Sequence, residues 1–274
     1  MSIITIAKDQ AGDLLRRRYL LVILIGCLAL IGMWIGYLAL MKSLFGMAQN
    51  APNYSGPNQS TAQGKEMMAL MMGGLQVMLH GLVGAIATLL ALGLMCFSVR
   101  SEISRGTIRM ILSRPVRRYE FFLGKWLGCV FIVFVYALLM GILVSTYTYF
   151  AFGKLQALVP ISLAMLFLKA ITVGSVGMAL SMLMRPILAL LVAYLAAAET
   201  FLFIANFVHG IVKGIMHFFF YLLPSYKAFD MYGSIMSGVS LSGVEIGYRV
   251  AYAVLLSALM LLIGAAVFQR KDLI

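Results

Sequence analysis

The most regular feature of the chain is a series of long apolar runs separated by shorter polar stretches. About 20 helical residues cross a hydrocarbon core about 30 Å thick, and several runs reach that length. They cover approximately residues 19–41, 73–98, 121–150, 157–184, 186–208 and 248–268. The pattern predicts an all-α integral membrane protein, in which residues 1–274 form one transmembrane domain with six spanning helices.

Two further segments have weaker patterns. Residues 1–18 mix apolar and charged positions, which favours an interfacial amphipathic helix on the inner leaflet over a frayed tail. Residues 209–247 are apolar and aromatic but are interrupted by glycines and by Pro224. This interruption predicts short helices that lie at, or dip into, the outer face before the last span.

Composition supports the membrane assignment, because 63% of the residues are hydrophobic and only 11% are charged. Soluble domains have about 25% charged residues. The formal net charge of +12 is concentrated in loops beside apolar runs and does not form a basic strip interleaved with aromatic residues. We therefore expect membrane lipid to be a partner and exclude nucleic acid.

The basic residues also predict orientation, because cytoplasmic loops are enriched in lysine and arginine. With six spans, one side receives Lys8, Arg16–Arg18, Arg100, Arg105, Arg109, Arg114, Arg117, Arg118, Lys125, Arg185, Arg270 and Lys271. The other side receives fewer basic residues over longer loops: Lys42, Lys65, Lys154, Lys213, Lys227 and Arg249. We expect both termini to be cytoplasmic.

No arrangement of residues in the sequence predicts catalysis. The chain has no phosphate-binding Gly-x-x-x-x-Gly-Lys-Ser/Thr motif, and its three histidines lack neighbours at metal-ligand spacing. Met67, Met68, Met71 and Met72 form a cluster that favours flexible packing over a copper site. We expect no enzyme activity, cofactor or metal in this chain, so active transport would need a partner or an ion gradient.

The connection between the second and third predicted spans has an unusual apolar cluster at Ile108, Met110, Ile111 and Leu112. Gly106 permits a turn before it, Thr107 can cap a helix, and Pro115 ends one. The pattern predicts a helix of about two turns over 107–113 with an apolar face. Such a face needs either a protein partner or the lipid headgroup surface.

This connection resembles the signature of the type-2 (ABC-2) permease family of ATP-binding cassette exporters. The family shows an acidic residue, Gly-Thr, Leu-Ser-x-Pro, an arginine, and Gly-Lys entering the next helix. The matching residues, in order, are Glu102, Gly106, Thr107, Leu112, Ser113, Pro115, Arg118, Gly124 and Lys125. The close of the chain around Phe268–Leu273 and the predicted topology are similar to the family as well.

The resemblance implies a permease subunit of a prokaryotic plasma-membrane exporter. Two permease chains, identical or homologous, would assemble with two copies of a cytoplasmic ATPase that binds ATP and Mg²⁺. Residues 107–113 would be the coupling helix that docks into the ATPase. The residues implied in coupling are Glu102, Gly106, Thr107, Ile108, Ile111, Leu112, Ser113, Pro115 and Arg118.

Two ionisable residues fall inside predicted spans, where charges are costly and usually paired or functional. Lys169 and Glu199 lie at similar distances from Arg185 at the turn between spans four and five, so their depths differ by only about 3 Å. We expect an ion pair that fixes the two spans together. A substrate or gating role, or contact with a water-filled path, remains open.

Two other classes of function remain open. An ATPase-independent carrier or channel would show an internal repeat or broken helices near mid-membrane, and no repeat is convincing between residues 1–150 and 151–274. A membrane scaffold would recruit a cytoplasmic protein through the same connection. The apolar outer segment favours a hydrophobic or amphipathic cargo but does not name it.

Overall fold

The structure is a computed structural model that describes residues 3–16, 80–104, 117–152, 158–197 and 242–270, and single positions at 26, 29, 32, 33, 36, 37, 210, 214, 226, 229 and 231. No strand occurs among these residues. The chain divides into two compact units, residues 1–12 with 80–274 and residues 13–79. In the second unit, the described positions from Gly26 to Tyr37 are helical and fall inside the predicted span 19–41.

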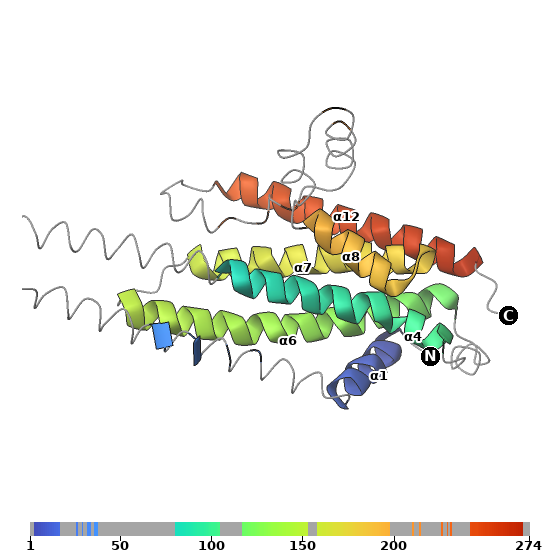
Figure 1. Ribbon diagram of the computed structural model, residues 1–274, viewed down its shortest axis with the longest axis horizontal. Helices are drawn as coiled ribbons and strands as arrows, with labels where there is room; N and C mark the ends of the chain where they lie inside the picture. The colour runs from blue at the N-terminus through green and yellow to red at the C-terminus, as the bar shows by residue number, and fades with distance from the viewer. Residues whose placement is uncertain are drawn as a thin grey trace, which may run out of the picture. The chain divides into compact units, whose positions relative to one another are not determined.

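The first unit is a bundle of helices (Figure 1). Its elements are α1 (Ile3–Arg16), a helix over His80–Ser104 whose last turn is α4 (Arg100–Ser104), α6 (Arg118–Phe152), α7 (Leu158–Leu183), α8 (Pro186–Ala197) and α12 (Gly243–Arg270). The His80–Ser104 helix, called here the 80–104 helix, and α6, α7 and α12 are each long and apolar enough to cross a bilayer. The chain is therefore a multi-pass helical membrane protein.

These four helices match predicted spans two, three, four and six, with shifted ends. The 80–104 helix continues past residue 98, and α12 begins at Gly243 rather than at 248. Ser242 explains the second shift, because its Oγ accepts a hydrogen bond from the Glu245 amide (3.2 Å) and caps the helix. Helix α8 covers the first half of predicted span 186–208, and residues 198–208 lie outside the described residues, as do most of 19–41.

Side-chain contacts fix the directions of the helices. Phe134 packs on Phe167, and the Trp126 indole donates a hydrogen bond to Ser175 (2.9 Å), so α6 and α7 are antiparallel. Lys125 on α6 pairs with Glu102, and the Tyr136 hydroxyl further along α6 donates to the Val83 carbonyl oxygen (3.5 Å), so the 80–104 helix also runs antiparallel to α6. We call the end of the bundle where α6 begins the Lys125 end, and the other the opposite end.

Helix α12 runs parallel to α7 and returns to the Lys125 end. The Ser257 hydroxyl donates to Thr172 (3.4 Å), and Gly264 lies against Ala179 with room for no side chain, since an added Cβ would be 3.3 Å from the Ala179 Cα. Small residues of this kind let membrane helices pack closely. Helix α7 contacts α6, α8 and α12 and forms the centre of the described bundle.

The interrupted segment before α12 contributes side chains to this bundle. Tyr226, Phe229 and Met231 are fully buried in a core cluster with residues of α7, α8 and α12. The Phe229 ring lies 6.2 Å from that of Tyr252, close to the start of α12. These three residues thus pack into the bundle, whereas Gly210 and Gly214 are exposed, and the other positions of 209–241 lie outside the described residues.

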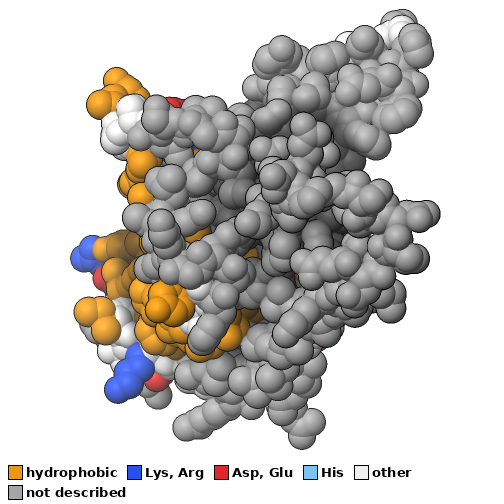
Figure 2. All heavy atoms as spheres, turned by 90° about the vertical axis from the view of Figure 1, so that its left-hand side faces the viewer, with side chains coloured by type: hydrophobic (Ala, Val, Ile, Leu, Met, Phe, Trp, Pro, Cys, Tyr) orange, Lys and Arg blue, Asp and Glu red, His pale blue; other side chains and the backbone are white. Residues whose placement is uncertain are grey.

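Figure 2 looks onto the end of the molecule where α6 ends and α7 begins. The described side chains visible there are mainly hydrophobic, with a few charged ones at the margin. Exposed apolar residues also cover the sides of α6 and α12, including Phe131, Ile142, Leu255 and Leu262. A lipid environment accounts for such exposure, which a soluble protein would avoid.

Candidate functional site

The predicted coupling segment falls in residues 105–116, which lie outside the described residues. The coupling roles of seven residues in it therefore remain predictions: Gly106, Thr107, Ile108, Ile111, Leu112, Ser113 and Pro115. The structure does describe both ends of the segment, because α4 ends at Ser104 and α6 begins at Arg118. The candidate site is the group of side chains that holds these two ends in place.

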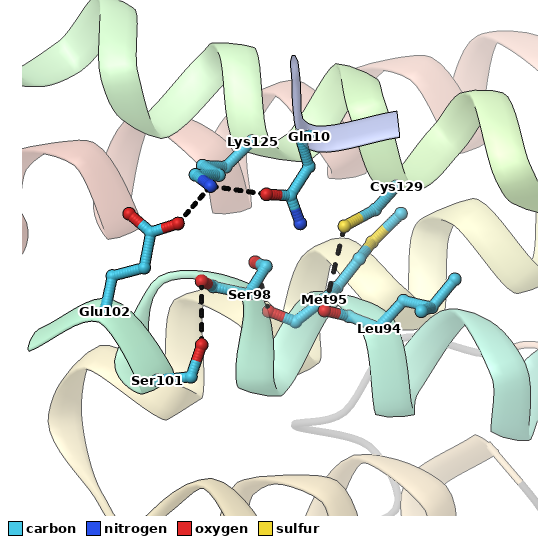
Figure 3. Close-up of polar contacts among 8 residues, drawn as sticks. All are labelled: Gln10, Leu94, Met95, Ser98, Ser101, Glu102, Lys125 and Cys129. Atoms are coloured by element: carbon cyan, nitrogen blue, oxygen red, sulfur yellow. Dashed lines mark hydrogen bonds and ion pairs between the residues drawn. The ribbon is translucent and has the colours of Figure 1, made fainter. Parts of the chain in front are cut away.

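A buried lysine joins three helices at this point (Figure 3). Lys125, on the second turn of α6, forms an ion pair with Glu102 of α4 and donates a hydrogen bond to the Gln10 side chain of α1. Lys125 and Gln10 are each only 6% exposed. A charge removed from water to this extent needs its partners, so the contact holds α4, α6 and α1 together.

Two glycines allow α1 to approach closely enough for this contact. An added Cβ at Gly124 would lie 2.8 Å from the Ile6 Cβ, and one at Gly128 would lie 2.8 Å from the Gln10 Cβ and 3.0 Å from the Ala7 carbonyl oxygen. The obstructing atoms are backbone or the base of a side chain, and they cannot move aside by a change of rotamer. The face formed by Gly124 and Gly128 is thus a seat for α1.

The seat also explains the pattern of α1. Ile6, Gln10 and Ala11 are buried, whereas Ile4 and Lys8 are exposed. The predicted amphipathic helix is present, and its buried side rests on α6 rather than only on lipid. Its position against the inner leaflet remains a prediction.

The end of α12 is attached to the first turn of α6. The Arg118 guanidinium donates to the Gln269 carbonyl oxygen at 3.0 Å, close to the negative end of the α12 dipole. Phe268, which is fully buried, packs between Phe121 and Phe122 with ring centroids 6.2 and 6.1 Å apart. Arg118 therefore links the predicted coupling segment to α12.

The serine hydroxyls along the last turns of the 80–104 helix are satisfied locally. The hydroxyls of Ser98, Ser101 and Ser104 each donate to the carbonyl oxygen three residues earlier. The Cys129 thiol of α6 approaches the Leu94 carbonyl oxygen at 3.7 Å. These bonds satisfy the three hydroxyls and the thiol without water.

Arg117 stands at the boundary between the predicted coupling segment and α6. A hydrogen bond to the Tyr119 hydroxyl (3.2 Å), with the charge of Glu120 nearby, raises the pKa of the Arg117 guanidinium above its usual value. The Arg117 amide donates to the Glu120 carboxylate (3.4 Å), which caps α6. The start of α6 thus keeps a positive charge at any physiological pH.

Glu102, Lys125 and Arg118 were identified from the sequence through the family motif, but the Glu102–Lys125 pair was not predicted. Gln10 was not identified, and the only sequence feature that could have indicated its role is that it is a polar residue on the apolar side of an amphipathic helix. Lys169 lies half-buried in α7. Glu199 lies outside the described residues, so their pairing stays a prediction.

The fold and the site define a class of protein: a multi-pass helical membrane protein whose helices are joined by a buried ionic contact at one end. The chain belongs to the family described as "Protein of unknown function (DUF2705)", whose model matches residues 19–274. No curated protein matches the chain. The matched region includes Glu102, Arg118 and Lys125, whereas α1 precedes it.

Proposed function

We propose that this chain is the transmembrane permease subunit of an ATP-driven exporter of the ABC-2 type. The observation that best supports this is the Glu102–Lys125 pair, which joins the two ends of the 105–116 connection across the start of α6. Because the connection is held at both ends, a displacement of residues 105–116 would also displace the attached helices. A loosely attached loop would change its own conformation and leave the helices in place.

In this proposal, the apolar face of Ile108, Ile111 and Leu112 docks into a groove on a cytoplasmic ATPase. Closure of two ATPase copies on ATP and Mg²⁺ moves the coupling helix. The Lys125 contact passes the movement to α1, and Arg118 passes it to α12. Two permease chains, identical or homologous, would form the path for a hydrophobic or amphipathic cargo.

The directions of the described helices favour six spans. Helix α1 lies at the Lys125 end, whereas the 80–104 helix starts at the opposite end, so the intervening chain must cross an odd number of times. The same holds between α8, which begins where α7 ends, and α12, which starts at the opposite end. Predicted spans 19–41 and 186–208 supply one crossing each.

The basic residues favour placing the Lys125 end in the cytoplasm of a prokaryotic cell, with the chain in the plasma membrane. Arg100, Arg117, Arg118 and Arg270 all belong to this end. At the opposite end, the described basic residue Arg249 pairs with Glu245 one helical turn away. Both termini are then cytoplasmic.

The proposal is tested by co-purification of the tagged chain with an ATP-binding cassette ATPase encoded beside it. We expect wild type to retain the ATPase at equal stoichiometry. Ile111→Asp places a charge on the docking face and should weaken binding by at least about 2 kcal/mol, roughly thirtyfold. Size-exclusion profiles of the variants check that they remain folded.

Val244→Asp is the matched control, because Val244 is 68% exposed at the opposite end of the bundle and an acidic residue suits the first turn of α12. It should retain the ATPase like wild type. Failure of folded wild type to retain any ATPase would contradict the proposal and would favour a carrier or a scaffold.

A further inference from the structure

An apolar cleft lies between α6 and α7, in the half of the bundle away from Lys125. Its volume is about 700 Å³, within the range of ligand pockets. Its walls are one stripe of each helix, with residues spaced three or four apart: Phe134, Ala137, Leu138, Gly141, Ile142, Ser145, Thr146 and Tyr149 on α6, and Pro160, Leu163, Ala164 and Phe167 on α7.

The cleft is closed at one end by aromatic rings and is polar only at the other. Phe134 and Phe167 meet with centroids 5.5 Å apart at an angle of 57° and bound this end of the cleft. The lining hydroxyls belong to Ser145, Thr146 and Tyr149, towards the end of α6. Any occupant that matches this lining has a long apolar body and one polar end.

The length of the cleft matches one leaflet of a bilayer. Fifteen positions separate Phe134 from Tyr149 on α6, which corresponds to about 22 Å along a helix, and the hydroxyl residues occupy the last third of this length. Half of a hydrocarbon core is about 15 Å. The polar end of the cleft therefore falls near the level where lipid headgroups begin and where tyrosine is enriched.

The mouth of the cleft lies along the candidate membrane span of α6. Phe134, Leu138 and Ile142 are 43%, 50% and 64% exposed, and all three belong to the candidate membrane span of α6. An empty apolar cleft forfeits dispersion contacts along both walls. The medium at the mouth supplies alkyl chains that restore them.

We propose that this cleft binds one alkyl chain of a membrane phospholipid from the leaflet at the opposite end, with the headgroup beside Ser145, Thr146 and Tyr149. The inference goes beyond the proposed function and does not depend on an ATPase. It requires only that α6 and α7 cross the membrane. The bound chain would fill the gap between the two helices and keep their outer halves apart.

The test is photolabelling of the full chain in vesicles of phosphatidylcholine that carries a diazirine midway along one chain. Adducts are mapped by mass spectrometry of peptides. We expect labelling of Leu138, Ile142 and Leu163 to exceed that of Leu255, Leu259 and Leu262 on α12, which are 70%, 53% and 69% exposed. A free diazirine fatty acid in unlabelled vesicles should label the cleft less than the phospholipid does.

Ala164→Phe fills the cleft from an exposed lining position and should lower its labelling by about tenfold. Ala258→Phe makes the same change at an exposed position of α12 and should leave cleft labelling unchanged. Equal labelling of the cleft and of α12, or no effect of Ala164→Phe, would overturn the proposal. In a second measurement a diazirine amino acid replaces Leu138, and crosslinks from it to residues 19–41 or to a second copy of the chain, rather than to lipid, would also overturn the proposal.

Discussion

At the scale of single residues, Lys125 is the most informative position in the structure. Its charge is almost fully removed from water, and its partners come from two other helices. The Phe121 ring adds a third contact, with the Lys125 ammonium 5.5 Å from its centroid. A buried cation so placed favours this arrangement of α1, α4 and α6, because moving α1 or α4 away would remove one of its partners.

Replacement of Lys125 by methionine should destabilise the protein by about 1–3 kcal/mol. The substitution keeps the apolar stem and removes the cation that Glu102 and Gln10 bind. The measurement is thermal unfolding of the purified chain in detergent, followed by circular dichroism. Lys8→Met is the matched control, because Lys8 is exposed on α1, and it should unfold at the wild-type temperature.

A double-mutant cycle separates the ion pair from general packing. Glu102→Gln and Lys125→Met should each lower stability, and the double variant should lose less than the sum of the two. Additive losses would show that the two side chains do not stabilise each other. The proposed transmission from residues 105–116 would then lack its main support.

Two of the three residues in this contact could be identified from the sequence. Glu102 and Lys125 stand out in the motif around the predicted coupling segment, since both are ionisable residues beside apolar runs. Gln10 could not be found in that way, because it meets Lys125 across 115 residues of chain. Helical periodicity reports which face of a helix is apolar and does not report which helix that face will meet.

At the scale of elements, α1 and α6 form a closely fitted pair. Gly124 and Gly128 lie one helical turn apart, and both contact the α1 backbone or the base of its side chains. The spacing makes a flat strip on α6 that fits one face of α1. The N-terminal helix is thereby joined to the span that follows the predicted coupling segment.

Gly128→Val should release α1 from α6. The new side chain would overlap Gln10 and the Ala7 carbonyl, and overpacking of this kind costs about 1–3 kcal/mol. Amide hydrogen exchange in α1 should therefore quicken by about tenfold or more, as measured by mass spectrometry. Exchange in α7 should remain unchanged.

Gly93→Val supplies the control for helix propensity. Gly93 belongs to the 80–104 helix, and an added Cβ there would meet nothing within 4 Å. In the Gly93→Val variant, the amides of α1 should exchange as fast as in wild type. Equal effects of the two substitutions would mean that Gly128 does not seat α1.

The long helices were predictable because bilayer thickness sets the length of an apolar run. Their ends were less predictable, since a helix continues where its polar residues find partners. The 80–104 helix extends past residue 98, where Glu102 of its last turn pairs with Lys125 of α6. Helix α12 starts early because Ser242 caps it.

At the scale of the whole molecule, the described helices are tied most firmly at one end. Side chains of α1, α4, α6 and α12 meet at the Lys125 end through Lys125 and Arg118. Away from that end, α6 and α7 separate around the cleft. We expect a displacement at residues 105–116 to move the tied end as one body and to be felt elsewhere mainly through α12, which packs along α7.

The helix directions make a prediction about sidedness that does not depend on cargo. Val244 and Arg270 are exposed near opposite ends of α12, so a single cysteine at each should lie on opposite sides of the membrane. The labelling uses a membrane-impermeant maleimide on cells that express variants in which Cys27, Cys96 and Cys129 are alanine. Val244→Cys should react in intact cells, and Arg270→Cys only after permeabilisation. Thr5→Cys, exposed on α1, should behave like Arg270→Cys, because α1 and the end of α12 both lie against the first turns of α6.

A reversed pattern would retain the six spans and invert the orientation, which would place residues 105–116 where no cytoplasmic ATPase can reach them. Reaction of Thr5→Cys on the same side as Val244→Cys would instead contradict the contact between α1 and α6.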